Sequence, residues 1–245
     1  MQDVNDLECG RDRSNDADVD GNIDFTTNQE VVYKFRDRNK RLVTEWQVFF
    51  ENDIKSEKVQ VSHGDIFKGA PSADAIVSPA NSFGFMDGGI DMAYSLHFGW
   101  QLQKRLQKVI RKEHHGEILV GAAVIIPIFE GGAKQESMNW KGANENKPIK
   151  YLISAPTMRV PQFVDDTVNS YLAFRAVVLA VENFNRHHDE KIKSVLCPGL
   201  GTAVGRMPFD RCAFQYKRPH DSDEDDDVNE HSLNRRLNFR PSRRK

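Results

Sequence analysis

Residues 75–91 read AIVSPANSFGFMDGGID, and this stretch decides the class of fold. It begins with three apolar residues, which predict a short buried strand, and Pro79 then marks a loop. The glycine pair Gly88-Gly89 closes the loop, and apolar residues at helical spacing follow it as far as residue 112. A strand, a glycine-containing loop and the start of a helix are therefore expected, in that order.

The same alternation continues on both sides of this stretch. Strands are expected at 31–35, 58–62, 75–77, 122–126, 151–154 and 194–197. Helices are expected at 40–51, 90–112, 167–186 and 209–216, the third with Asp165 or Asp166 as its N-cap. Residues 129–148 are rich in Gly, Asn and Lys, which predicts an exposed loop. The alternation predicts an α/β fold whose mainly parallel sheet is covered on both faces, with ligands beyond the carboxyl ends of the strands.

The composition suits one medium domain with appendages. The chain has 245 residues, a net charge of −2 and 39% hydrophobic residues. No run of about 18 apolar residues occurs, so no membrane-spanning helix is expected. The three cysteines form no Cys-x-x-Cys pair, so neither a disulfide framework nor a cysteine zinc site is expected. We therefore expect a reducing compartment, cytoplasmic or nuclear.

The small net charge conceals a separation of charges along the chain. Residues 1–30 carry nine acidic and two basic side chains, a balance of −7. Residues 218–245 carry seven of each sign, as an acidic block followed by a basic end, which leaves +5 for the middle. We expect 1–28 and 218–245 to be disordered and 29–217 to form the domain. A nucleic-acid role for the basic end is not favoured, because the neighbouring acidic block would screen it.

Two loops carry polar residues that suit a nucleotide ligand. Asp65, in the turn Gly64-Asp65-Ile66 after an expected strand, can accept a hydrogen bond from an exocyclic amine or can simply stabilise the turn. In the second loop Asn81 suits sugar hydroxyls, and the glycine pair before a helix start suits an anion. The alternative for the second loop is an ordinary strand-to-helix connection in which Asp91 only stabilises the helix start.

A third loop, residues 197–206, reads CPGLGTAVGR and follows the last expected strand. Three glycines and a threonine within it predict a second anion cradle. The loop lacks the Lys-Ser/Thr pair of a P-loop and the spacing of the dinucleotide fingerprint, which disfavours a triphosphatase and a nucleotide oxidoreductase. Cys197 is interpreted as a core residue and not as a nucleophile. Two glycine-rich loops around one cleft suit a diphosphate, and with Asp65 and Asn81 they outline ADP-ribose.

The order of these motifs resembles that of a macrodomain, over roughly residues 30–217. The Ala80-Asn81 pair followed by a glycine run that ends in Ile90-Asp91 is similar to the hydrolytic branch of that family. The resemblance implies a three-layer α/β/α sandwich with a mixed, mostly parallel central sheet. It also implies that Asp65 binds the adenine amino group and that the glycine loops hold the diphosphate. The implied ligand-binding residues are Asp65, Ile66, Ala80, Gly88, Gly89, Ile90, Gly199, Leu200, Gly201, Thr202, Ala203, Val204 and Gly205.

The resemblance further implies hydrolysis of ADP-ribose from modified proteins or from small ADP-ribose esters. Asn81 would orient the distal ribose and Asp91 would position or polarise the attacking water, with the phosphate of the ligand as base. No metal and no cofactor are expected, and the partner is ADP-ribose or an ADP-ribosylated protein, bound by a monomer. The alternative is a reader module that binds ADP-ribose without cleaving it.

Overall fold

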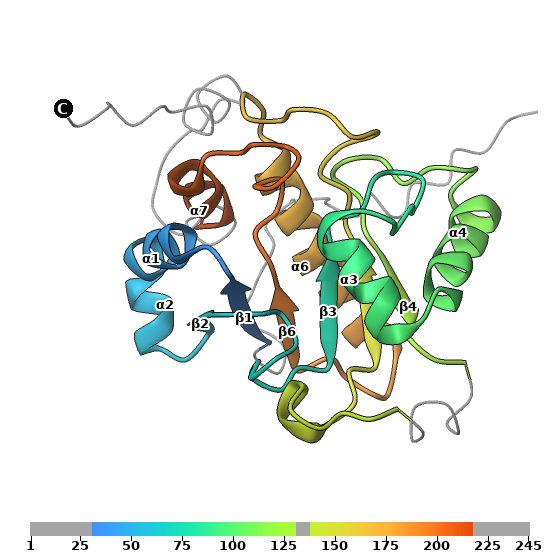
Figure 1. Cartoon of the computed structure of the whole chain (residues 1–245), viewed down its shortest axis with the longest axis horizontal. Coiled ribbons are helices and arrows are strands. Elements are labelled where there is room, and N and C mark those ends of the chain that lie inside the picture. The colour runs from blue at the N-terminus through green and yellow to red at the C-terminus, as the bar shows by residue number, and fades with distance from the viewer. Residues whose placement is uncertain (1–30, 131–137, 218–245) are drawn as a thin grey trace, which may run out of the picture.

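The computed structural model describes residues 31–130 and 138–217 of the chain (Figure 1). A six-stranded sheet in the order β2-β1-β6-β3-β5-β4 forms its centre. All neighbours run parallel except β4, which is antiparallel to β5, so the expected mixed, mostly parallel sheet is confirmed. The strands are β1 (Val32–Asp37), β2 (Val59–His63), β3 (Ala75–Ser78), β4 (Val124–Pro127), β5 (Tyr151–Ser154) and β6 (Ser194–Cys197).

Helices cover both faces of the sheet, because alternate strand residues feed two separate cores. In β3, for example, Ala75 and Val77 join one core and Ile76 joins the other. The first core contains residues of α1, α6 and α7, and the second contains residues of α3 and α4. Figure 1 shows α3 in front of the strands and α6 behind them, as a three-layer sandwich requires. The helices are α1 (Lys40–Phe49), α2 (Glu51–Lys55), α3 (Gly89–Phe98), α4 (Gln101–Glu113), α6 (Asn169–His187) and α7 (Phe209–Lys217).

Two of the helix predictions were wrong in detail. The segment expected as one helix over 90–112 is divided into α3 and α4, because Gly99 adopts a positive φ of 95° that ends the first of them. The N-cap of α6 is Val168, which makes no side-chain capping bond, and not Asp165 or Asp166. The Asp166 carboxylate instead lies 3.6 Å from the Arg211 guanidinium of α7.

Part of the segment expected as an exposed loop over 129–148 is buried. Asn144 begins a short 3-10 helix, η1 (Asn144–Asn146), and its side-chain amide pairs with the backbone of Ala73. Trp140 packs into the second core. These contacts join the segment to the residues just before β3, an arrangement that its polar composition does not indicate.

The two predicted tails, 1–28 and 218–245, lie outside the described residues. None of the helices within the described ranges is long and apolar enough to cross a membrane. Cys197 and Cys212 are buried and unpaired, and burial raises the pKa of both thiols. Cys197 is thus a core residue, as expected, and it is not a thiolate nucleophile.

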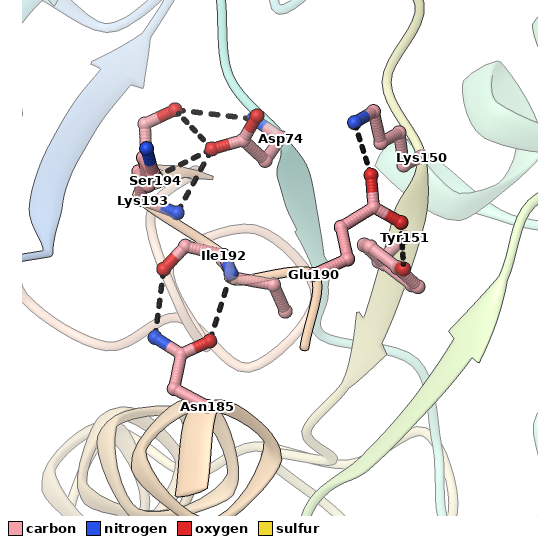
Figure 2. A network of polar contacts seen from close by, with 8 residues as sticks. All are labelled: Asp74, Lys150, Tyr151, Asn185, Glu190, Ile192, Lys193 and Ser194. Atoms are coloured by element: carbon pink, nitrogen blue, oxygen red, sulfur yellow. Dashed lines mark hydrogen bonds and ion pairs between the residues drawn. The ribbon is translucent and has the colours of Figure 1, made fainter. Parts of the chain in front are cut away.

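At the amino ends of the strands a polar network joins β3, β5 and β6 (Figure 2). Oδ2 of Asp74, the residue before β3, accepts hydrogen bonds from Lys193 N at 2.9 Å and from Ser194 N and Oγ, both at 3.0 Å. Close by, Glu190 accepts from Lys150 Nζ and Tyr151 Oη. Asp74 therefore aligns β3 and β6 at their amino ends, whereas a ligand is expected at the carboxyl ends of the strands.

Replacing Asp74 with alanine is expected to lower the free energy of unfolding by about 1–2 kcal/mol, because two backbone N–H groups lose their acceptor. Glu190→Ala, at the same ends of the strands but with one exposed ion pair and one exposed hydrogen bond, is the matched control and should cost less than about 1 kcal/mol. Urea titration of both variants measures the difference. Equal losses in the two variants would contradict the role given to Asp74.

Candidate functional site

The structure has two adjoining clefts at the carboxyl ends of the strands. The main cleft, of about 200 Å³, is lined by residues from 79–91, 157–161 and 198–205, together with Asp37. The side cleft, also of about 200 Å³, continues toward β2. It is lined by Arg36, Asp37, Arg38, Gly64, Ile66, Gly89, Ile90 and Ala93.

Most of the site residues expected from the sequence meet at these clefts. Ile66 lines the side cleft. Leu200 is fully buried in the first core, and Asp65 is not among the lining residues of either cleft. The main cleft is lined by Ala80, Asn81, Gly88, Gly89, Ile90, Asp91, Gly199, Gly201, Thr202, Ala203, Val204 and Gly205.

The glycine pair opens the amino end of α3 to the main cleft. Gly89 has a φ of 56°, and a Cβ atom at either glycine would meet no other atom within 4 Å. The N-cap, Gly88, provides no side-chain cap, and the first N–H groups of a helix have no acceptor within it. These N–H groups and the helix dipole therefore offer a binding place for an anion.

The loop 199–205 faces α3 across the main cleft. Gly201 has a φ of 73°, and a Cβ atom at Gly205 would lie 2.5 Å from the Gly201 carbonyl oxygen, so the tight turn needs glycine at both positions. Within the part of the chain that the structure describes, the amides of 202–205 donate to no protein acceptor. The loop thus presents a second row of backbone donors to the cleft.

Asn81 lies at the cleft and also shapes its wall. Its Oδ1 accepts hydrogen bonds from Phe83 N at 3.0 Å and Phe85 N at 3.4 Å, and its Nδ2 donates to Phe85 O at 3.3 Å. The side chain thereby holds the turn that precedes the glycine pair. Exposed Phe85 lies at the rim of the cleft.

Asp91, in the first turn of α3, is the buried acid of the site. Only 7% of its surface is exposed, and Ser78 Oγ, at the end of β3, donates to its Oδ1. Burial raises the pKa of Asp91 to about 7, and the hydrogen bond from Ser78 opposes that rise. A carboxyl group that titrates near neutrality within a cleft is suited to proton transfer or to orienting water.

Asp65 has the environment of a turn residue. Its Oδ1 accepts from Phe67 N and Lys68 N, both at 2.9 Å, and Oδ2 pairs with Arg38. Burial favours the neutral acid, but the bonds from Lys68 and Arg38 outweigh it and hold the pKa of Asp65 at about 2. The carboxylate is therefore largely occupied by the protein itself.

Residues 26–214 match the family described as Macro-like domain. The chain belongs to that family. An uncharacterized protein of Aquifex aeolicus is 29% identical over 156 residues, which cover 64% of this chain and 73% of the relative. An uncharacterized protein of Aeropyrum pernix is 32% identical over 148 residues, which cover 60% of this chain and 62% of the relative.

The solved structures that match this chain include macrodomains. The macrodomain of Mycobacterium tuberculosis DarG is 18% identical, with a TM-score of 0.46, over 63% of this chain and 88% of its own. The Oceanobacillus iheyensis macrodomain with ADP is 22% identical, with a TM-score of 0.46, over 62% and 70% of the two chains.

Two residues of this macro-like domain were missed by sequence reasoning. Asp37 lines both clefts because β1 extends to residue 37, two residues beyond the expected end of the strand. Tyr216 of α7 is fully buried, and its hydroxyl donates to Pro198 O at 2.7 Å and accepts from Leu200 N at 3.0 Å. An acidic residue at the carboxyl end of a strand was a usable signal for Asp37. No local pattern indicates that Tyr216 anchors the loop 199–205.

Within residues 31–130 and 138–217, no group of three or more His, Cys, Asp or Glu side chains is placed to hold a metal ion.

Proposed function

We propose that this macro-like domain binds ADP-ribose and hydrolyses the bond that joins it to a modified protein or to a small ester. The observation that carries the proposal is the pair of donor rows, at the amino end of α3 and in 202–205, that face each other across one cleft beside buried Asp91. Membership of the Macro-like domain family supports it.

The two donor rows suit a diphosphate, because several N–H groups share its charge at no cost in side-chain ordering. The distal ribose then lies beside Asn81 and Asp91. A water molecule oriented by Asp91 attacks the anomeric carbon, and the bond to the protein side chain breaks while a phosphate oxygen of the ligand accepts the proton. The rate gain comes from positioning the water and from electrostatic stabilisation.

Asn81→Ala and Asp91→Ala are each expected to lower turnover at least about tenfold, equivalent to about 1.4 kcal/mol in the barrier. The substrate is a protein carrying mono-ADP-ribose on an acidic side chain, and released ADP-ribose is measured. Asn183→Ala and Asp189→Ala, at exposed positions at and just beyond the carboxyl end of α6, are the matched controls. Undiminished activity in both cleft variants would contradict the hydrolase proposal.

A second candidate function is a reader that binds ADP-ribose without cleaving it. Two observations favour it: the Asn81 amide is already engaged by the backbone of its own turn, and the Asp91 carboxyl is buried against Ser78. Calorimetry distinguishes the two functions. Tight binding of ADP-ribose, with none released from the modified protein over hours, would select the reader.

A further inference from the structure

The main cleft and the side cleft meet at Asp37. This residue, with Gly89 and Ile90, lines both of them. Asp37 is the last residue of β1, which lies between β2 and β6 in the sheet. Its position between the turn after β2 and the loop after β6 is thus set by strand pairing and not by local sequence.

The Asp37 carboxylate retains capacity to accept hydrogen bonds from a ligand. Oδ1 accepts from Asn39 N at 2.7 Å, and Oδ2 accepts from Gly199 N in a long bond of 3.3 Å. An ionised carboxylate has about four acceptor positions, so about two stay open. Asp65, by contrast, accepts three bonds within the protein and lines neither cleft.

A ligand that occupies both clefts places a defined part of itself at their junction. The side cleft has the apolar side chains of Ile66, Ile90 and Ala93, which suit the faces of a base. The main cleft has the two donor rows, which suit a diphosphate. The part that joins a base to a diphosphate is a ribose, and its hydroxyl groups are donors for which a carboxylate is a suitable acceptor.

We propose that Asp37 binds the hydroxyl groups of the ribose nearest the base and thereby excludes ligands that carry a phosphate on the 2′-oxygen. The inference rests on the proposed binding of ADP-ribose and adds a selectivity to it. The negative charge of Asp37 favours a hydroxyl donor and repels a phosphate at the same place. One side chain therefore both binds an unmodified ribose and disfavours a 2′-phosphorylated one.

The arginines that line the side cleft are already engaged within the protein, Arg36 through three hydrogen bonds and Arg38 through one ion pair. Arg36 is buried and donates to Asp65 O at 2.6 Å, Ser62 Oγ at 2.9 Å and Lys68 O at 3.0 Å. Arg38 is paired with the Asp65 carboxylate. A 2′-phosphate at the junction would lie against the Asp37 carboxylate, so the expected selectivity requires that this repulsion exceed the attraction of exposed Arg38.

The test measures the affinity of the full chain for four ligands: ADP-ribose, 2′-phospho-ADP-ribose, ADP and 2′-deoxy-ADP. The wild type is expected to bind ADP-ribose at least about tenfold more tightly than its 2′-phosphorylated form, and ADP several-fold more tightly than 2′-deoxy-ADP. Asp37→Asn is nearly isosteric and should bring the first ratio to within about threefold, because the repulsion is removed. Asp189→Asn, at an exposed position that lines neither cleft, is the matched control and should leave both ratios as in the wild type.

Each outcome decides between definite alternatives. If the wild type binds ADP-ribose but accepts the 2′-phosphate equally well, or if Asp37→Asn leaves the ratios as in the wild type, the role of Asp37 is overturned while the proposed function stands. If no ADP-ribose binds to the wild type, the proposed function fails and this inference fails with it. The wild-type ratios test the proposal even if Asp37→Asn does not fold.

Discussion

Replacing Asp91 with asparagine is expected to stabilise the protein by on the order of 4 kcal/mol at pH 8 and to change its stability little near pH 4. Asparagine is neutral at every pH and keeps an oxygen that can accept the hydrogen bond from Ser78. The gain at high pH arises because the wild type must ionise a carboxyl group of α3 that is buried against Ser78 at the end of β3.

The sign follows from proton binding in the two states. Burial raises the pKa of Asp91 to about 7 in the folded protein, whereas in the unfolded chain it is about 3.9. Between these values the folded state holds a proton that the unfolded state has lost, so stability falls as the pH rises, by at most about 1.4 kcal/mol per unit. Above pH 7 both states are ionised and the full cost is present.

Urea titrations of the wild type and Asp91→Asn at intervals from pH 4 to pH 8 measure this effect. The two stability curves should diverge from pH 4 upward and become parallel above pH 7. Asp87→Asn, an exposed acid in the same loop, is the control and should shift stability by less than about 0.5 kcal/mol at every pH. Parallel curves for Asp91→Asn over the whole range would show that this carboxyl is not strained by burial.

The same substitution bears on the proposed function. A buried acid that lowers stability at neutral pH is expected where the acid has a task. If Asp91 orients the attacking water, the stabilised variant should lose turnover, and the wild type should gain activity as the pH rises through 7. A stability gain together with loss of activity would therefore point to the hydrolase, whereas the reader requires only unchanged binding.

Replacing Tyr216 with phenylalanine is expected to lower the free energy of unfolding by about 2–4 kcal/mol and to weaken ADP-ribose binding. The hydroxyl joins Pro198 O and Leu200 N, which lie at the base of the loop 199–205, and its loss leaves both backbone groups buried without this partner. The ring stacks on Phe174 at 4.6 Å between centroids, and phenylalanine preserves that contact. The cost is therefore assigned to the hydroxyl and not to packing.

Tyr151→Phe is the matched control for this variant. The Tyr151 hydroxyl donates to exposed Glu190 at the amino ends of the strands, away from the clefts. Its removal should cost less than about 1 kcal/mol and leave binding unchanged. Urea titration measures stability, and calorimetry with ADP-ribose measures the effect on the loop. A Tyr216→Phe protein as stable as the wild type would show that the loop does not depend on this anchor.

Features with a local cause could be predicted from the sequence. The bounds of β5 and β6 were predicted correctly, because strands buried on both faces are short apolar runs between polar residues. The glycine pair could be placed between a strand and a helix for a similar reason, since only a few neighbouring residues determine such a turn. The break between α3 and α4 was missed, because apolar residues continue at helical spacing across Gly99.

The tertiary structure alone decided the role of each carboxylate at the site, namely those of Asp37, Asp65 and Asp91. Asp37 and Asp65 both follow strands, yet Arg38 and two backbone amides occupy Asp65, whereas pairing of β1 with β6 brings Asp37 to the junction of the clefts. Asp91 titrates near neutrality only because α3 packs it against β3. The sequence by itself determined the order of strands, loops and helices, which depends on neighbouring residues. Hydrogen bonding and burial depend on residues far apart in the chain, and the folded structure alone brings these together.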